Sequence, residues 1–258
     1  MKNVLPILYF VIPCYHDAQT LSVSAPVFLE KLTSFIEQRQ IHPDSRVLFV
    51  NDGSTDGTWD KIVCLYTADT HVVGVDLAWN AGELNALLAG MQTAVKKADC
   101  VITMDSDLQD DIRCTDEMLR LFTAGNDVVL GVRTGRRDDP LSDRITSDAF
   151  YFVMRVLRTG LVRQHSNYRL LSREAVLRVL DAEPPYFLPC LACNLGLPTA
   201  LTYHERNARA AGMSAYTFRK RLRMGLHAVA AHTAVRRFLP PDREPPFEIR
   251  QILEHEIP

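Results

Sequence analysis

Two glycine-rich phosphate-binding loops are missing from this sequence of 258 residues. There is no G-x-x-x-x-G-K-[ST] motif, and no G-x-G-x-x-G motif follows the first apolar run. In the proteins that carry them, these loops wrap the backbone around a phosphate or pyrophosphate group. Their absence argues against a kinase and against an NAD-dependent enzyme.

An excess of charge and an unbroken apolar run are missing as well. Lys and Arg number 29 and Asp and Glu 31, for a formal charge of −2. This balance argues against a general nucleic-acid-binding protein, which normally carries a basic excess. The longest uncharged stretch, residues 184–203, contains four prolines that would interrupt a spanning helix. We therefore expect no transmembrane helix.

The six cysteines show no disulfide-rich spacing, and most of them lie in apolar runs. This pattern favours free thiols in a reducing compartment, so we expect a cytoplasmic protein. Only Cys190 and Cys193 have a spacing typical of metal ligands. Because no second pair or histidine follows at a zinc-finger distance, a metal site at these cysteines is disfavoured.

Alternating strand and helix patterns predict an α/β protein with a mainly parallel central sheet and helices on both faces. Buried-strand runs occupy residues 7–13, 46–50, 72–77, 100–104 and 127–132, with a short extended segment at 168–171. Amphipathic helices are expected from Ser24, with Pro26 in the first turn, and over residues 84–95, 115–123, 150–161 and 218–238.

We expect one domain over residues 1–238, followed by a loose tail over residues 239–258. Within the domain, a Rossmann-like nucleotide-sugar half would span residues 1–110 and an acceptor half residues 111–217. A basic amphipathic helix would then close the domain over residues 218–238.

Three polar clusters fall at predicted strand ends, over residues 13–17, 51–57 and 105–111. In a parallel α/β sheet, ligands bind at the carboxyl ends of the strands. Placed on one edge, the clusters form a pocket with several carboxylates and few bases. Such a pocket suits a divalent cation and, through the cation, a diphosphate.

Asp105 and Asp107 give the sharpest signal, because two carboxylates in one turn after a buried strand can meet one divalent ion. A simple polar turn is the alternative. Asp52 is expected to hydrogen-bond a base or ribose edge beside the tight turn at Gly53. The alternative there is a helix cap formed by residues 54–56, and both roles can hold because different residues serve them.

Taken together, these motifs resemble the family 2 glycosyltransferases of GT-A fold, and within them the polyprenyl-phosphate sugar transferases such as dolichol-phosphate mannose synthase. The family's Pro-x-Tyr-Asn-Glu opening is matched by Pro13-Cys14-Tyr15-His16-Asp17, its nucleotide turn by Asn51-Asp52-Gly53-Ser54, its helix start by Asn80-Ala81-Gly82, and its metal motif by Asp105-Ser106-Asp107-Leu108-Gln109-Asp110. Later matches are Gly131-Val132-Arg133 with Arg136-Arg137, Tyr168-Arg169-Leu170-Leu171-Ser172-Arg173, and the segment from Arg209 to Tyr216.

The sequence departs from the family pattern at several of these motifs. His16 and Asp17 replace Asn and Glu, Trp79 replaces a common Arg, and Glu83 replaces a basic or polar residue. Asn167 stands where Asp or Ser is frequent, and Ala215 replaces Lys.

The resemblance implies an inverting transfer from a UDP- or GDP-linked sugar, with Mg²⁺ or Mn²⁺ held by Asp105 and Asp107. The residues expected to bind the nucleotide are Pro13, Tyr15, Asp17, Asp52, Asn80, Gly82 and Asp105. Arg133, Arg209 and Ser214 are expected to contact phosphate oxygens, with solvated surface charge as the alternative for the two arginines.

The acceptor stays open between a polyprenyl phosphate, which the resemblance favours, and a soluble hydroxyl group. A phosphate monoester needs no base, because its second pKa is about 6. A hydroxyl acceptor would need one, for which Asp110 or Asp111 is the candidate.

Residues 218–238 are expected either to contact the inner face of a membrane peripherally or to pack on the catalytic domain. Two other classes compete with the transferase, a non-catalytic binding subunit and a sugar nucleotidyltransferase. Asp105 and Asp107 argue against the first, and the missing glycine-rich loop argues against the second.

Overall fold

A computed structural model describes residues 5–134, 141–182, 188–205, 207 and 247–255. Its strands are β1 (Leu8–Cys14), β2 (Arg46–Asn51), β3 (Val72–Leu77), β4 (Cys100–Thr103), β5 (Val128–Thr134), β6 (His165–Ser172), β7 (Thr199–Glu205) and β8 (Ile249–Leu253). Its helices are α1 (Ala18–Glu37), α2 (Thr58–Ala68), α3 (Glu83–Ala94), α4 (Cys114–Thr123), α5 (Leu141–Val156), α6 (Arg173–Leu180) and α7 (Leu188–Cys193).

These strands form one eight-stranded sheet in the order β7-β5-β6-β4-β1-β2-β3-β8. The central strands β4, β1, β2 and β3 run parallel, whereas β6 pairs antiparallel with both β4 and β5. The α/β class and the mainly parallel centre are therefore as the sequence predicts. Because β6 bridges β4 and β5, the two halves of the chain share a single sheet.

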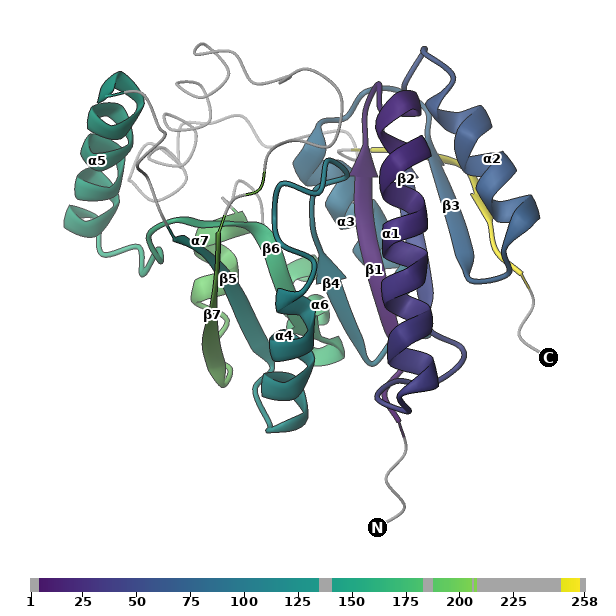
Figure 1. Ribbon diagram of the computed structural model, residues 1–258. Coiled ribbons are helices and arrows are strands. Elements are labelled where there is room, and N and C mark those ends of the chain that lie inside the picture. The colour runs from purple at the N-terminus through teal and green to yellow at the C-terminus, as the bar shows by residue number, and fades with distance from the viewer. Residues whose placement is uncertain (1–4, 135–140, 183–187, 206, 208–246, 256–258) are drawn as a thin grey trace.

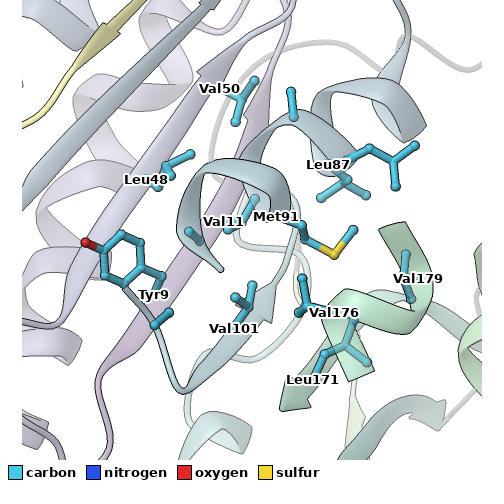
Figure 2. Close-up of a cluster of buried hydrophobic side chains, with 14 of the residues drawn as sticks. Tyr9, Val11, Leu48, Val50, Leu87, Met91, Val101, Leu171, Val176 and Val179 are labelled. Carbon is cyan, nitrogen blue, oxygen red and sulfur yellow. The ribbon is translucent and has the colours of Figure 1, made fainter. Parts of the chain in front are cut away.

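Helices cover both faces of this sheet, with α1, α2 and α4 in front and α3 and α6 behind in Figure 1. Side chains alternate across each strand, so that Leu8, Phe10 and Ile12 face one core, with α1 and α4, while Tyr9 and Val11 face the other. Figure 2 shows the second core, where Leu87 and Met91 of α3 pack against the β1–β2 surface. Both faces of the central strands are buried from solvent, which explains why their sequences are almost continuously apolar.

Helix α1 begins at Ala18, earlier than the expected start at Ser24, and Pro26 lies inside it. The buried positions Leu21 and Ala25 continue the apolar stripe of the helix upstream of the proline. Pro26 itself is exposed. Water can therefore satisfy the carbonyl that loses its helical partner, and burial of the stripe offsets the cost of the proline.

The expectation of a loose tail is wrong for the C-terminal residues that the structure describes. Strand β8 pairs antiparallel with the edge strand β3, and Phe247 and Ile249 pack against the core behind the sheet. Beyond the strand, Glu254 accepts a hydrogen bond from the Tyr9 hydroxyl at 3.3 Å, and the His255 ring stacks on Tyr66.

Helix α5 ends at Val156, short of the expected residue 161. Arg158 and Gly160 adopt positive φ values of 52° and 68° and turn the chain away from the helix axis. Across the described ranges, no helix is long and apolar enough to cross a membrane. The expected helix over residues 218–238 lies outside them.

Candidate active site

The three polar clusters meet at the carboxyl edge of the central strands, where the sequence placed them. After β1, the His16 amide donates to Ser54 Oγ at 3.0 Å, and the Asp17 amide donates to Thr58 Oγ1 at 2.9 Å. From the end of β4, Ser106 Oγ donates to Asp17 Oδ2 at 2.9 Å. The segment after β1 therefore lies between the other two clusters and is tied to both.

Asp52 fixes the segment that joins β3 to α3. Its carboxylate accepts hydrogen bonds from the amides of Ala81 at 2.7 Å and Gly82 at 3.0 Å, and the residue is 3% exposed. Helix α2 has Gly57 as its N-cap residue, and the preceding Asp56 accepts from the Thr58 amide at 3.1 Å through Oδ1. A contact between Asp52 and a base or ribose stays a prediction.

Gly53 lets the β2 turn approach the β3–α3 segment more closely than any side chain would allow. It has φ +62°, and a Cβ atom here would lie 2.3 Å from the carbonyl carbon of Trp79 and 2.4 Å from the amide nitrogen of Asn80. Gly82 also has a positive φ, +91°, but open space beside it. Trp79 and Asn80 are both exposed, so this segment presents side chains at the edge of the site.

The residues after β1 divide between core and surface. Pro13 is buried opposite Val50 in the parallel ladder, whereas the Tyr15 ring is 38% exposed and stacks on the His16 ring at 4.1 Å. Burial raises the pKa of the Asp17 carboxyl, and the nearby charge of Asp107 adds to this shift. Hydrogen bonds from the Tyr15 amide and Ser106 oppose it.

Asp105 follows β4 directly and is surrounded by other carboxylates. Desolvation raises its pKa well above the usual 3.8, and the charges of Glu83, Asp110 and Asp107 raise it further, while Arg133 opposes them. Arg133 Nη2 lies 3.9 Å from Asp105 Oδ2. A second cation placed beside Asp105 would relieve this repulsion.

The donor set suits a divalent cation whose coordination a diphosphate completes. Carboxylate oxygens are preferred ligands of Mg²⁺ and Mn²⁺, and Asp105 and Asp107 supply them from one turn. In the described part of the chain, no three His, Cys, Asp or Glu side chains are arranged to hold a metal ion by themselves. Asp105 and Asp107 would supply carboxylate ligands to such an ion, and the nucleotide would contribute further oxygen ligands.

Asp110 is placed to hold Arg133, which argues against the general-base role considered for it. It is 2% exposed and accepts from Arg133 Nε at 2.9 Å and from His204 Nε2 at 2.9 Å. Burial alone would raise the pKa of this carboxyl, but the His204 hydrogen bond and the Arg133 charge outweigh it and hold the pKa at about 2. So acidic a group is a weak base near neutral pH.

Asp111, the other candidate base, is a poor one for a related reason. Arg113 donates to both of its carboxylate oxygens, from Nε at 2.9 Å to Oδ1 and from Nη2 at 2.7 Å to Oδ2. These hydrogen bonds lower the pKa of the Asp111 carboxyl. Neither expected base is therefore poised to take a proton from a hydroxyl acceptor.

Sequence reasoning missed Arg169 and His204 as parts of this site. Arg169 is fully buried in β6, where desolvation lowers its pKa to about 10 against the opposing charges of Cys193, Glu83 and Asp105. Its Nη2 donates to Asn167 Oδ1 at 3.0 Å, and Asn167 Nδ2 donates to Glu83. An arginine inside an apolar strand was the available signal, because such residues are rarely buried without a charge partner.

Two of the predicted phosphate contacts, Arg209 and Ser214, lie outside the described residues, as does Ala215. The described site therefore consists of the strand-end clusters, the segment between β3 and α3 that Asp52 holds, and Arg133 with Asp110 and Asp105 beside it. Its fold and acidic edge define a protein of the GT-A glycosyltransferase type, an α/β sheet that presents carboxylates at its carboxyl edge.

Comparisons with known proteins agree with this class. The model of glycosyl transferase family 2 matches residues 9–180. An uncharacterized glycosyltransferase of Bacillus subtilis (strain 168), YkoT, is 33% identical over 90% of this chain and 69% of its own length. The bactoprenol glucosyl transferase of Shigella phage SfV is 30% identical over 86% of this chain and 70% of its own length. The protein belongs to glycosyl transferase family 2.

Solved structures show the same fold at low sequence identity. Glucosyl-3-phosphoglycerate synthase from Mycobacterium tuberculosis, in complex with Mn²⁺, UDP and glucosyl-3-phosphoglycerate, has a TM-score of 0.55 at 17% identity, covering 88% of this chain and 78% of its own. The mannosyltransferase PcManGT from Pyrobaculum calidifontis, in complex with GDP-Man and Mn²⁺, has a TM-score of 0.53 at 16% identity. The match covers 95% of this chain and 69% of the mannosyltransferase chain.

Proposed function

We propose that this glycosyltransferase moves a sugar from a UDP- or GDP-linked donor to a polyprenyl phosphate, with inversion at the anomeric carbon. The meeting of three acidic strand ends at one sheet edge, tied by Asp17, carries the donor half of the proposal. The acceptor half is supported by the 30% identity to a bactoprenol glucosyl transferase over 86% of the chain. Transfer to a soluble hydroxyl acceptor is the alternative.

On the donor side, Asp52 and the segment that it holds would bind the nucleoside. Asp105 and Asp107 would hold Mg²⁺ or Mn²⁺ at the diphosphate. When bound, the ion would offset the charge that develops on the departing nucleotide. Mn²⁺ accompanies UDP and GDP-Man in the two solved structures of this fold, which supports a divalent metal here.

On the acceptor side, Arg133 would orient phosphate oxygens. Its guanidinium group is held on one edge by Asp110 and lies near Asp105, so it projects toward the metal-binding turn. Arginine binds phosphate oxygens in a planar, bidentate manner. Because Asp110 and Asp111 are poor bases, an acceptor that is already ionised, such as a phosphate monoester, suits this site better than a hydroxyl group.

The exposed face of α5 is a surface suited to a lipid-linked acceptor. Phe152, Val153 and Val156 are 58%, 39% and 63% exposed, and the Arg155 guanidinium lies 5.5 Å from the centre of the Phe152 ring. Helix α5 is the next described element after β5, which carries Arg133, and it stands apart from the sheet in Figure 1. Apolar side chains interleaved with arginine suit a peripheral contact with an anionic membrane.

A transfer assay tests the proposal. The purified protein would be incubated with Mn²⁺, UDP-glucose or GDP-mannose, and undecaprenyl phosphate in detergent. We expect a glycosylated lipid phosphate from one donor, and at least a hundredfold slower transfer for Asp107→Ala, because that change removes a ligand of the metal. Asp181→Ala, which removes an exposed carboxylate beyond α6, is the matched control.

Each alternative gives a distinct result in this assay. Transfer to a hydroxyl acceptor without transfer to the lipid phosphate would contradict the acceptor assignment. Absence of both transfer and nucleotide binding would favour a non-catalytic subunit.

A further inference from the structure

The C-terminal strand reaches the candidate nucleotide site from outside the matched family region. Residues 9–180 match the family model, whereas β8 begins at Ile249. It pairs antiparallel with β3, with Asp76 opposite Gln251 and a register shift between Asp76 and Leu77. The segment that Asp52 holds follows β3 directly, so β8 lies beside the start of that segment.

Arg250 of β8 forms two hydrogen bonds at the end of β3. Its Nη1 donates to Asp76 Oδ2 at 3.0 Å, and its Nη2 donates to the Ala78 carbonyl oxygen at 2.8 Å. The Ala78 amide in turn donates to the Glu248 carbonyl oxygen at 2.9 Å. The start of the segment between β3 and α3 is thus bonded to the C-terminal residues on both sides of its backbone.

Asp76 carries this contact across to the turn after β2. The residue is 2% exposed, and its other carboxylate oxygen accepts from Asn51 Nδ2 at 2.6 Å. Asn51 Oδ1 then accepts from the Ser54 amide at 3.2 Å. A buried carboxylate needs a cation and hydrogen-bond donors around it, and Arg250 supplies the cation.

The two segments held by this relay are those that meet at Asp52 and Gly53. Asp52 accepts from the amides of Ala81 and Gly82, and Gly53 abuts the backbone of Trp79 and Asn80. Arg250 thus contacts one segment directly and reaches the other through Asp76 and Asn51.

We propose that Arg250 is a positioning residue for the nucleoside of the donor. By way of Asp76 and Asn51, it sets the spacing between the β2 turn and the segment between β3 and α3. This inference rests on the proposed function, in which those segments bind the nucleoside. In this role Arg250 acts through Asp76, Asn51 and the Ala78 carbonyl oxygen.

Other contacts anchor β8 independently of Arg250. Lys97 Nζ lies 2.9 Å from Glu254 Oε1, the Tyr9 hydroxyl donates to the same oxygen, and the His255 ring stacks on Tyr66 at 4.0 Å. Phe247 and Ile249 pack on the core. Removal of the Arg250 guanidinium therefore leaves the strand in place and changes the relay.

Calorimetric titration tests the relay against a purely structural role. Binding of UDP and GDP would be measured with Mn²⁺, and binding of UMP and GMP with EDTA, to wild type, Arg250→Gln, Arg250→Lys and Gln251→Ala. We expect Arg250→Gln to weaken the affinity for the nucleoside diphosphate that binds and for the matching monophosphate by about the same factor, roughly tenfold. Arg250→Lys should recover part of this loss, because it keeps the charge toward Asp76.

Gln251→Ala is the matched control, since this neighbouring side chain is exposed, and its affinities should equal those of wild type. Unchanged affinity in Arg250→Gln, with or without a lower melting temperature, would overturn the inference. If that variant does not fold, Arg250→Lys decides, because wild-type affinity at an unchanged melting temperature would overturn it equally. A wild-type protein that binds no nucleotide with Mn²⁺ would instead overturn the proposed function.

Discussion

At the scale of single residues, Asp110 shows how a carboxylate near the reaction can serve structure. Its oxygens are occupied by Arg133 and His204, and the segment 105–111 that carries it would also supply the metal ligands. The sequence shows the acidic residues of this segment but not their partners. His204 lies 94 residues from Asp110 along the chain, and no local pattern links the two.

The effect of Asp110 on stability can be measured directly. Its folded-state pKa of about 2 lies below the ordinary 3.8, so its contribution is fully present above about pH 4 and is lost as the pH falls toward 2. The shift corresponds to about 2 kcal/mol. We expect Asp110→Asn to lower the free energy of unfolding in urea by about that amount, both at pH 7 and at pH 5. Asp181→Asn should lose nothing, and equal stability of both variants at pH 7 would refute the assignment.

Gly53 gives a second prediction, because its backbone conformation and its surroundings both exclude a side chain. In Gly53→Ala the new Cβ would lie within 2.4 Å of backbone atoms of Trp79 and Asn80. We expect a loss of about 3 kcal/mol in unfolding free energy, together with weaker nucleotide binding. Gly125→Ala is the matched control, since Gly125 also has a positive φ, +98°, but nothing within 4 Å of a Cβ atom.

The control should lose only about 1 kcal/mol, which is the cost of the strained φ angle alone. Nucleotide affinity in Gly53→Ala equal to that of Gly125→Ala would show that the close approach of the two segments is not needed for binding.

At the scale of elements, the sequence predicts the central strands and the polar clusters that follow them well. Continuous apolar runs identify strands buried on both faces, and the topology then brings their ends to one edge. Strand β8 was missed because it is short, follows a proline-rich stretch, and pairs with β3 about 175 residues away along the chain. Its burial depends on a partner that local periodicity does not reveal.

Helix α5 carries the prediction for the membrane contact. Phe152→Ser together with Val156→Ser should weaken co-sedimentation with anionic lipid vesicles by about tenfold, because two exposed apolar side chains no longer enter the lipid interface. Leu177→Ser, which changes an apolar residue of α6 that is 48% exposed, should bind like wild type. Equal loss in both variants, or in neither, would remove α5 from the proposed contact.

At the scale of the whole molecule, one sheet connects the acidic donor edge to the strands that carry Arg133 and His204. Antiparallel β6 lies between β4 and β5 and carries Arg169, whose pKa is lowered by burial against the opposing charges of Cys193, Glu83 and Asp105. The fold class followed from sequence pattern. The pairings across the sheet did not, because they join residues far apart along the chain.

The central claim is that the carboxyl edge of this sheet binds a nucleotide diphosphate through a divalent metal. Titration of UDP and GDP into the protein, with Mn²⁺ and with EDTA, tests it most directly when wild type is compared with Asp107→Ala. We predict binding of one nucleotide that is at least tenfold tighter with Mn²⁺, and that Asp107→Ala loses this gain while remaining folded. Affinity that is the same with and without metal, or unaltered in Asp107→Ala, would contradict the claim.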